Sequence, residues 1–174
     1  MHNYLLEGQS TDRLMFRKVV ESDFDAWLPF HEEPLSSQYW DGLPSNPKVA
    51  CQQQFDRIFE RYDKHLGGMN ALILKENSKL VGLCGLLVQY VDYKKELEIG
   101  YSILPEYWRR GLAFEAAQQC KIHAFDNDLT KSLISIIHID NVPSRKVAIK
   151  NGMKLDKTTT YHDNPVHIFR VSQS

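Results

Sequence analysis

Hydrophobic and polar residues along the chain follow two periods that alternate from segment to segment. Runs rich in β-branched and aromatic residues, several of them with period-two alternation, predict seven strands, over 13–19, 70–75, 79–90, 96–104, 131–139, 154–161 and 166–171. Apolar residues that recur every three or four positions predict four helices, over 24–30, 47–66, 111–126 and 141–151. The order βααβββαβαββ predicts an α/β (α+β) fold with a mixed sheet and helices on both faces, because a doubly wound parallel fold would alternate strictly.

Capping and turn residues give the expected limits of the second helix. Asn46 and Pro47 form a typical start, with an N-cap followed by proline in the first position. The pair Gly67 and Gly68 is expected to end this helix. Residues 31–45 are punctuated by proline, serine and glycine, so we expect a loop there.

Size and charge narrow the classes of function. A length of 174 residues predicts one domain, spanning 1–174. A net charge of −1 gives no general attraction to nucleic acid or to an anionic membrane. No apolar run approaches about 20 residues, and the first residues lack a signal-peptide pattern, so we expect a cytoplasmic protein. The cysteines are expected to be buried free thiols, namely Cys51, Cys84 and Cys120.

The most informative stretch joins the strand 96–104 to the following helix. Pro105 removes a backbone donor and stops the strand, and the turn that follows contains Arg109, Arg110 and Gly111. A strand, a basic glycine-containing turn and a helix N-terminus together form an anion site, because free N–H groups and the positive dipole end point at the ligand. Neither a GxxxxGK[ST] loop nor a GxGxxG turn is present, so two common phosphate-binding designs are excluded.

This turn resembles the acetyl-CoA signature of the GCN5-related N-acetyltransferase (GNAT) family, [Q/R]-x-x-G-x-[G/A]. Gly111 and Ala113 match the signature, whereas Trp108 stands in its first position. That departure is similar to the branch of ribosomal-protein alanine and serine N-terminal acetyltransferases, in which Tyr-Trp precedes the loop and Glu-Ala follows it. Here these pairs are residues 107–108 and 115–116.

A second segment carries the same resemblance. Residues 141–153 are similar to the family pattern N-x-x-S-x-x-(V/L)-x-x-K-x-G-(F/M). The resemblance covers the chain from about Thr11 to its end. It implies the GNAT fold, a mixed and mostly antiparallel sheet of about seven strands.

The resemblance implies acetyl-CoA as the co-substrate. No cluster of His, Cys, Asp or Glu has metal-ligand spacing, so we expect no metal. The pyrophosphate would bind the turn, where Gly111 lets the backbone approach closely. The pantetheine arm would pair with the strand before it, and Asn141 would bind this arm, cap its own helix, or do both. The implied cofactor-binding residues are Ile99, Tyr101, Ser102, Ile103, Arg109, Arg110, Gly111, Leu112, Ala113, Asn141 and Ser144.

Two residues are candidates for proton transfer. Glu98 is the preferred general base, since a carboxylate on the floor of a cleft is partly desolvated and its pKa rises. A solvated glutamate on a strand face is the alternative, and Glu96 is a weaker rival. The family's usual tyrosine acid is replaced by Ala148, so the resemblance points to Ser144 as the proton donor to the thiolate. Capping of a helix start is the other interpretation of this serine.

The acceptor side is less defined. Aromatic residues on an irregular segment suggest a wall for the acceptor, so we expect Tyr39, Trp40 and His138 to line it, although a histidine at a strand end is more often only structural. No cysteine lies in the cofactor motifs, so transfer to a primary amine, either a protein N-terminus or a small amine, should be direct and within a ternary complex. The alternative is a CoA-binding module that no longer catalyses. A monomer and a homodimer both stay open.

Overall fold

The computed structural model describes residues 3–174, which form seven strands and four helices. The strands are β1 (Leu14–Lys18), β2 (Gly67–Leu74), β3 (Lys79–Val91), β4 (Lys94–Ile103), β5 (Ser132–His138), β6 (Lys154–Tyr161) and β7 (Asn164–Ser172). The helices are α1 (Phe24–Glu32), α2 (Pro47–Asp63), α3 (Leu112–Asp126) and α4 (Val142–Lys150). Three short 3₁₀ turns add to these, η1 (Glu21–Asp23), η2 (Pro34–Ser36) and η3 (Pro105–Tyr107). The predicted order of elements is confirmed.

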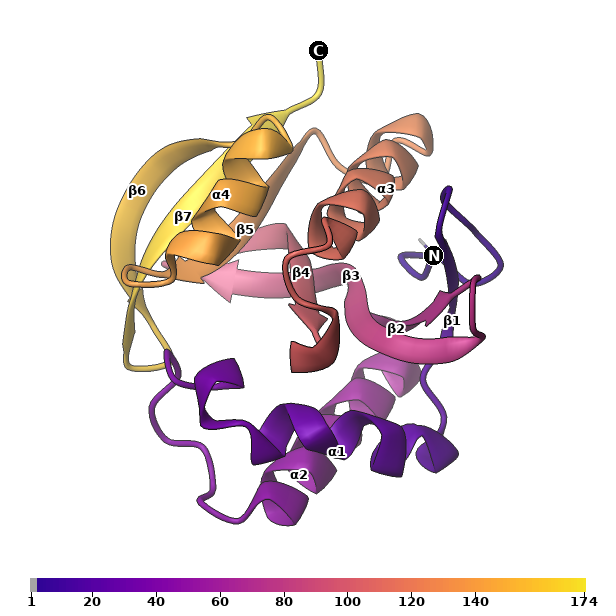
Figure 1. The fold of residues 1–174 in the computed structure, drawn as a ribbon. Coiled ribbons are helices and arrows are strands. Elements are labelled where there is room, and N and C mark those ends of the chain that lie inside the picture. Colours follow the sequence, from indigo (N-terminus) through magenta and orange to yellow (C-terminus); the bar gives the residue numbers. More distant parts are fainter. Residues whose placement is uncertain (1–2) are drawn as a thin grey trace.

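The seven strands form one sheet in the order β1-β2-β3-β4-β5-β7-β6. Every neighbouring pair is antiparallel except β4 and β5, which are parallel. Helices α3 and α4 cover one face, and α1 and α2 cover the other (Figure 1). The predicted mixed sheet with helices on both faces is therefore confirmed. No helix within residues 3–174 is long and apolar enough to cross a membrane.

One predicted boundary was wrong. Helix α2 ends at Asp63, and Gly67 and Gly68 belong to β2 rather than to a helix cap. A Cβ on Gly67 would lie 2.0 Å from the carbonyl oxygen of Leu86 on β3. Both glycines also have positive φ angles, +72° and +143°. Gly67 is required because the backbones of β2 and β3 approach closely here, whereas a Cβ on Gly68 would lie 3.1 Å from the ring of Tyr62 on α2. The sequence pattern does not distinguish these reasons for glycine from a helix end.

The main core lies between the sheet and the helices on both faces. Its largest fully buried side chains include Trp27, Phe16 and Phe55. The three cysteines are free and buried, as predicted. Two of them meet between β3 and α3, where the sulfur atoms of Cys84 and Cys120 are 3.6 Å apart.

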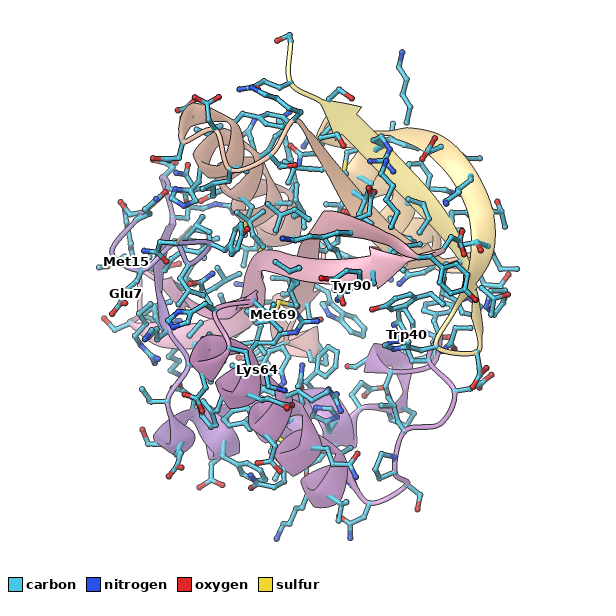
Figure 2. The ribbon with its side chains drawn as sticks, turned by 180° about the vertical axis from the view of Figure 1, so that it is seen from behind. Glu7, Met15, Trp40, Lys64, Met69 and Tyr90 are labelled. Carbon is cyan, nitrogen blue, oxygen red and sulfur yellow. The ribbon has the colours of Figure 1, made fainter. Side chains whose placement is uncertain are left out.

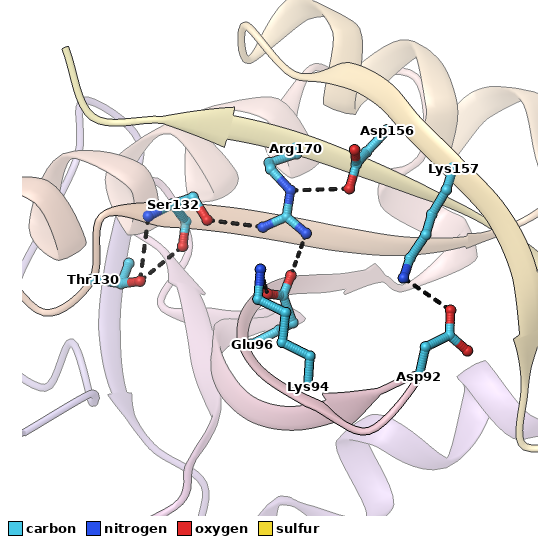
Figure 3. A network of polar contacts seen from close by, with 8 residues as sticks. All are labelled: Asp92, Lys94, Glu96, Thr130, Ser132, Asp156, Lys157 and Arg170. Carbon is cyan, nitrogen blue, oxygen red and sulfur yellow. Dashed lines mark hydrogen bonds and ion pairs between the residues drawn. The ribbon is translucent and has the colours of Figure 1, made fainter.

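A polar network ties β4 to the strands beyond β5 (Figure 3). Glu96 on β4 is 6% exposed and binds Nη2 of Arg170 on β7 at 2.6 Å. The same guanidinium donates to Ser132 of β5 at 2.8 Å and to Asp156 of β6 at 3.1 Å. Lys94 lies 3.5 Å from the second oxygen of Glu96. The network therefore binds the N-terminal half of β4 to the rest of the sheet.

We expect Arg170→Met to destabilise the protein by about 1.5–3 kcal/mol, because Glu96 would keep its buried charge and lose its hydrogen-bonded partner. For a chain of this size that corresponds to a melting temperature lower by roughly 5–10 °C. Thermal unfolding measures the effect, and Lys131→Met, which removes only exposed contacts with Asp128 and Gln173, is the control. Equal melting temperatures for the two variants would contradict the assignment.

Candidate functional site

Strands β4 and β5 separate after a single parallel pairing, Glu98 with Ile134. Two side chains take the place of the next ladder bonds. Ser135 donates its hydroxyl to the carbonyl of Ile99 at 2.9 Å, and the N–H of Ile136 points to Oε2 of Glu98 at 3.4 Å. The backbone groups that would continue the ladder are thus satisfied locally, and the two strands diverge toward the C-terminal end of β4.

Beyond this point, the backbone of Tyr101 faces the gap between β4 and β5. In an antiparallel ladder, alternate residues direct their N–H and C=O toward and away from the partner strand. The carbonyls of Ile99 and Ile103 accept bonds from Ser135 and from Nε1 of Trp108, at 2.9 and 2.7 Å, so these residues face away from β3. Tyr101 lies between them and has the same orientation. Among the predicted strand residues, it is the one best placed to pair with an extended ligand, whereas Ser102 directs its backbone toward β3.

The turn between β4 and α3 has the geometry that an anion site requires. Arg109 and Gly111 have left-handed backbones, with φ of +62° and +76°, and α3 begins at Leu112. The residues of the turn are exposed, whereas Leu112 is buried against the core and anchors the helix start. The free N–H groups of the first turn of α3 therefore open to solvent at Gly111. The indole N–H of Trp108 donates to the carbonyl of Ile103 and so fixes the turn, and this side chain is not free to bind a phosphate.

An ion pair from Arg13, just before β1, holds this turn in place, and sequence reasoning missed it. Nη1 of Arg13 donates to the carbonyl of Arg110 at 2.9 Å, and its Nε lies 2.8 Å from Glu115 in the first turn of α3. Burial raises the pKa of Glu115, but hydrogen bonds from Thr11 and Arg13 outweigh this effect and the pKa is lowered. The contact joins residues 102 positions apart, and no local pattern indicates it.

Ser144 and Tyr101 meet on the α3–α4 face of the sheet. The hydroxyl of Ser144 lies 3.2 Å from the hydroxyl of Tyr101, which itself donates to the carbonyl of Ser144 at 2.8 Å. Asn141 is the residue that caps α4, through a bond from the N–H of Ser144 to its side chain at 3.2 Å. The serine hydroxyl therefore contacts β4 and does not cap the helix. Burial raises the pKa of Tyr101.

Glu98 faces the opposite side of β4, because it lies three positions from Tyr101. Its Oε1 accepts a bond from Nε2 of Gln89 at 3.0 Å. Burial raises the pKa of Glu98, while the donors Gln89 and Ile136 and the charge of Arg61 oppose that rise. The rival Glu96 is engaged by Arg170 and Lys94. Glu98 is therefore the partly desolvated carboxylate where the sheet divides.

Two of the three residues predicted to line the acceptor wall meet from distant parts of the chain. The rings of Tyr39 and His138 lie 5.6 Å apart, although 99 positions separate them in the sequence. Trp40 and Tyr161 pack against a small apolar cluster of β3, β5 and β7. Figure 2 shows Trp40 beside the β6–β7 hairpin. His31, in contrast, binds Gln54 at 2.6 Å on α1 and α2, away from these residues.

Together these groups suit an extended anionic ligand that contains amides. The exposed turn at Gly111 suits a pyrophosphate, and the backbone of Tyr101 suits a chain of amides. Ser144 and Glu98 lie on opposite faces of β4 near the division of the sheet. Within residues 3–174, no three His, Cys, Asp or Glu side chains are arranged to hold a metal ion.

Comparisons with known proteins agree with this geometry. The family model described as "Acetyltransferase (GNAT) domain" matches residues 13–154. The uncharacterized protein YkkB of Bacillus subtilis (strain 168) is 30% identical over 162 residues, which is 91% of this chain and 92% of YkkB. An acetyltransferase from Agrobacterium tumefaciens str. C58 superposes with a TM-score of 0.81 at 24% identity, covering 98% of this chain and 96% of that one.

A further solved structure is similar in fold. It is RimL, a ribosomal L7/L12 alpha-N-protein acetyltransferase in complex with coenzyme A, with a TM-score of 0.75 at 14% identity. The alignment covers 95% of this chain and 97% of RimL. The resemblance that the two sequence motifs indicated is thus confirmed at the level of family and fold.

Proposed function

The chain belongs to the GNAT family of acetyltransferases, and we propose that it transfers the acetyl group of acetyl-CoA directly to a primary amine within a ternary complex. The observation that carries this proposal is the division of the sheet at Glu98, on the strand that leads into the exposed turn at Gly111. Acetyl-CoA supplies an activated acetyl thioester and is the co-substrate. The free thiols of the chain suit a reducing compartment, in agreement with the predicted cytoplasmic location.

In this proposal, cofactor binding is divided among three segments. The N–H groups at Gly111, Leu112 and Ala113 receive the pyrophosphate, and the nearby guanidinium groups of Arg109 and Arg110 add charge. The backbone of Tyr101 pairs with the amides of the pantetheine arm, beside Ile99, Ser102 and Ile103. Asn141 caps α4 and so places the helix start beside the arm.

The chain must also move two protons. The amine has to lose a proton before it attacks, and Glu98 is positioned as the general base, directly or through water. The leaving thiolate has to gain a proton, and the hydroxyl of Ser144 can deliver it. The serine hydroxyl donates to the hydroxyl of Tyr101, which itself donates to the carbonyl of Ser144, so this contact holds the serine in place and solvent returns its proton. The serine replaces the acid that is missing at Ala148.

On the acceptor side, Tyr39, Trp40 and His138 form the wall against which the amine enters. The ring contact between Tyr39 and His138 supports this placement. Protein N-termini and small amines are both compatible with this wall. The similarity in fold to RimL, an alpha-N-protein acetyltransferase, favours protein N-termini. A CoA-binding module without catalysis is the second candidate, favoured by Ala148 in place of the usual acid.

Binding of CoA or acetyl-CoA is expected to raise the melting temperature, because a ligand that binds only the folded state stabilises it by RT ln(1 + [L]/Kd). At one hundred times Kd this is about 2.7 kcal/mol, or roughly 5–10 °C for a chain of this size. Dephospho-CoA and ATP each share only part of the structure of CoA, so they serve as controls and are expected to raise the melting temperature less. An unchanged melting temperature at millimolar CoA would refute the proposal. A second assay mixes acetyl-CoA with a panel of amines: release of free CoA thiol indicates the enzyme, and no release indicates a CoA-binding module without catalysis.

A further inference from the structure

Glu98 lies at one end of a chain of polar contacts from three elements of the fold. Its Oε1 accepts a bond from Nε2 of Gln89 on β3 at 3.0 Å. The other end of that amide, Oε1 of Gln89, accepts two bonds. One comes from Nη2 of Arg61 on α2 at 2.9 Å, and the other from the hydroxyl of Tyr161 on β6 at 2.8 Å.

These two donors determine the orientation of the amide. Guanidinium nitrogens can only donate, so the side of Gln89 that faces Arg61 must be its oxygen. The NH₂ group must then face Glu98, and a flipped amide would set donor against donor on one side and acceptor against acceptor on the other. Arg61 is itself held, because its Nη1 donates to the carbonyls of Val88 and Leu66 at 2.9 and 3.3 Å.

We propose that Gln89, locked by Arg61 and Tyr161, is a positioning residue that holds the Glu98 carboxylate ready to take the proton of the acceptor amine. The inference rests on the proposed function, in which Glu98 is the base. The amide gives the carboxylate one fixed hydrogen bond on Oε1 and directs Oε2 toward Ile136, at the point where β4 and β5 separate. It also places a neutral group between Glu98 and the guanidinium, so that the two charges do not pair directly and the carboxylate stays available.

The groups that act electrostatically on this site come from several elements. Arg61 of α2 lowers the pKa of Glu98, although burial has the larger, opposite effect. Tyr161 of β6 has a pKa raised to about 12, by burial first and by Glu98 second, so its hydroxyl stays protonated and donates. The charge of Glu98 also raises the pKa of Tyr101 on β4, where burial is again the largest cause. Strand β3 contributes the neutral Gln89, and β5 contributes the backbone of Ile136.

The sign of the effect follows from these contacts. A donor to a carboxylate favours its charged form, so removing the donor raises the pKa of Glu98 further. The acid limb of the pH dependence of kcat/KM then moves to higher pH. For Gln89→Leu we expect the ratio of variant to wild-type kcat/KM to fall as pH decreases and to level off about tenfold lower at pH values below the wild-type midpoint of Glu98, the loss that one charge-assisted hydrogen bond typically represents. A residue with only a structural role would lower the rate equally at all pH values.

The experiment measures the titration of Glu98 directly, through the side-chain carboxyl resonance of ¹³C-labelled protein, beside the pH–rate profile. Gln89→Leu and Arg61→Met should each move the midpoint of Glu98 to higher pH. Lys64→Met, which removes an exposed cation just after α2 that pairs with Glu60, should leave this midpoint unchanged. Gln89→Met repeats the test with a side chain of similar length in case the leucine variant does not fold.

The two readouts separate this inference from the proposed function. If the variants shift the midpoint of Glu98 but the wild type acetylates no amine, the role of Gln89 in holding Glu98 is supported and the proposed acetyl transfer is refuted. A wild-type pH–rate profile for Gln89→Leu and Gln89→Met, with an unmoved Glu98 resonance, would overturn the inference while leaving acetyl transfer intact.

Discussion

Gly111→Asp is expected to abolish CoA binding at concentrations that saturate the wild type, while the protein still folds. The backbone at Gly111 is left-handed, and aspartate is among the few residues that tolerate this conformation. An added Cβ meets nothing closer than Nη2 of Arg13, at 3.5 Å. The new carboxylate would sit where the pyrophosphate should bind, and like charges at such a distance cost about 2–3 kcal/mol after allowance for solvent, or on the order of 30- to 150-fold in Kd.

Two further variants distinguish charge from shape and from folding. Gly111→Asn has nearly the same size and the same tolerance of a left-handed backbone, but it carries no charge. It should weaken binding much less than Gly111→Asp. Gly8→Asp introduces the same residue at another left-handed glycine with open space around it, and it should bind CoA normally. Isothermal titration with CoA gives the three affinities, and normal binding by Gly111→Asp would show that the pyrophosphate lies elsewhere.

Glu98→Gln is expected to lower kcat by about 10²–10⁴-fold near neutral pH, the usual contribution of a general base. Amines are mostly protonated there, since α-amino groups titrate near about 8 and lysine near about 10.4. Glutamine keeps the size of the side chain but cannot take the proton. The deficit should therefore shrink as pH rises and free amine becomes abundant, whereas Kd for acetyl-CoA should change little. The pH–rate profiles of wild type and variant with a working acceptor measure both effects.

Stability provides the control for this variant. Because burial raises the pKa of Glu98 in the folded state, its contribution to stability is complete at low pH and is lost as pH rises through the folded pKa. A permanently neutral glutamine escapes that loss, so at neutral pH the variant should unfold at a temperature no lower than the wild type. Glu96→Gln should behave in the opposite way, with lower stability and an unchanged pH–rate profile, because Glu96 serves the ion network with Arg170. Parallel profiles for wild type and Glu98→Gln would remove Glu98 from the mechanism.

The sequence by itself determined the order of elements, because side-chain period and capping are local properties. Alternation along β4 places Glu98 and Tyr101 on opposite faces. Asn141, a typical N-cap residue, indicates the start of α4. The turn at Gly111 was equally visible, since an anion site at a helix start is assembled from consecutive residues. The two motifs that indicated the GNAT family lie in these same local segments.

Tertiary structure alone decided which distant side chains complete the site. Gln89, Arg61 and Tyr161 meet around Glu98 only after β3, α2 and β6 are packed together, and Arg13 reaches Glu115 across 102 positions. The pair Gly67 and Gly68 could not be assigned in advance, because a helix end and a close approach of two strands both favour glycine. The division of the sheet depends on Ser135 and Glu98 replacing ladder bonds between β4 and β5. Such partners are set by strand register and packing, which no local pattern of residues specifies.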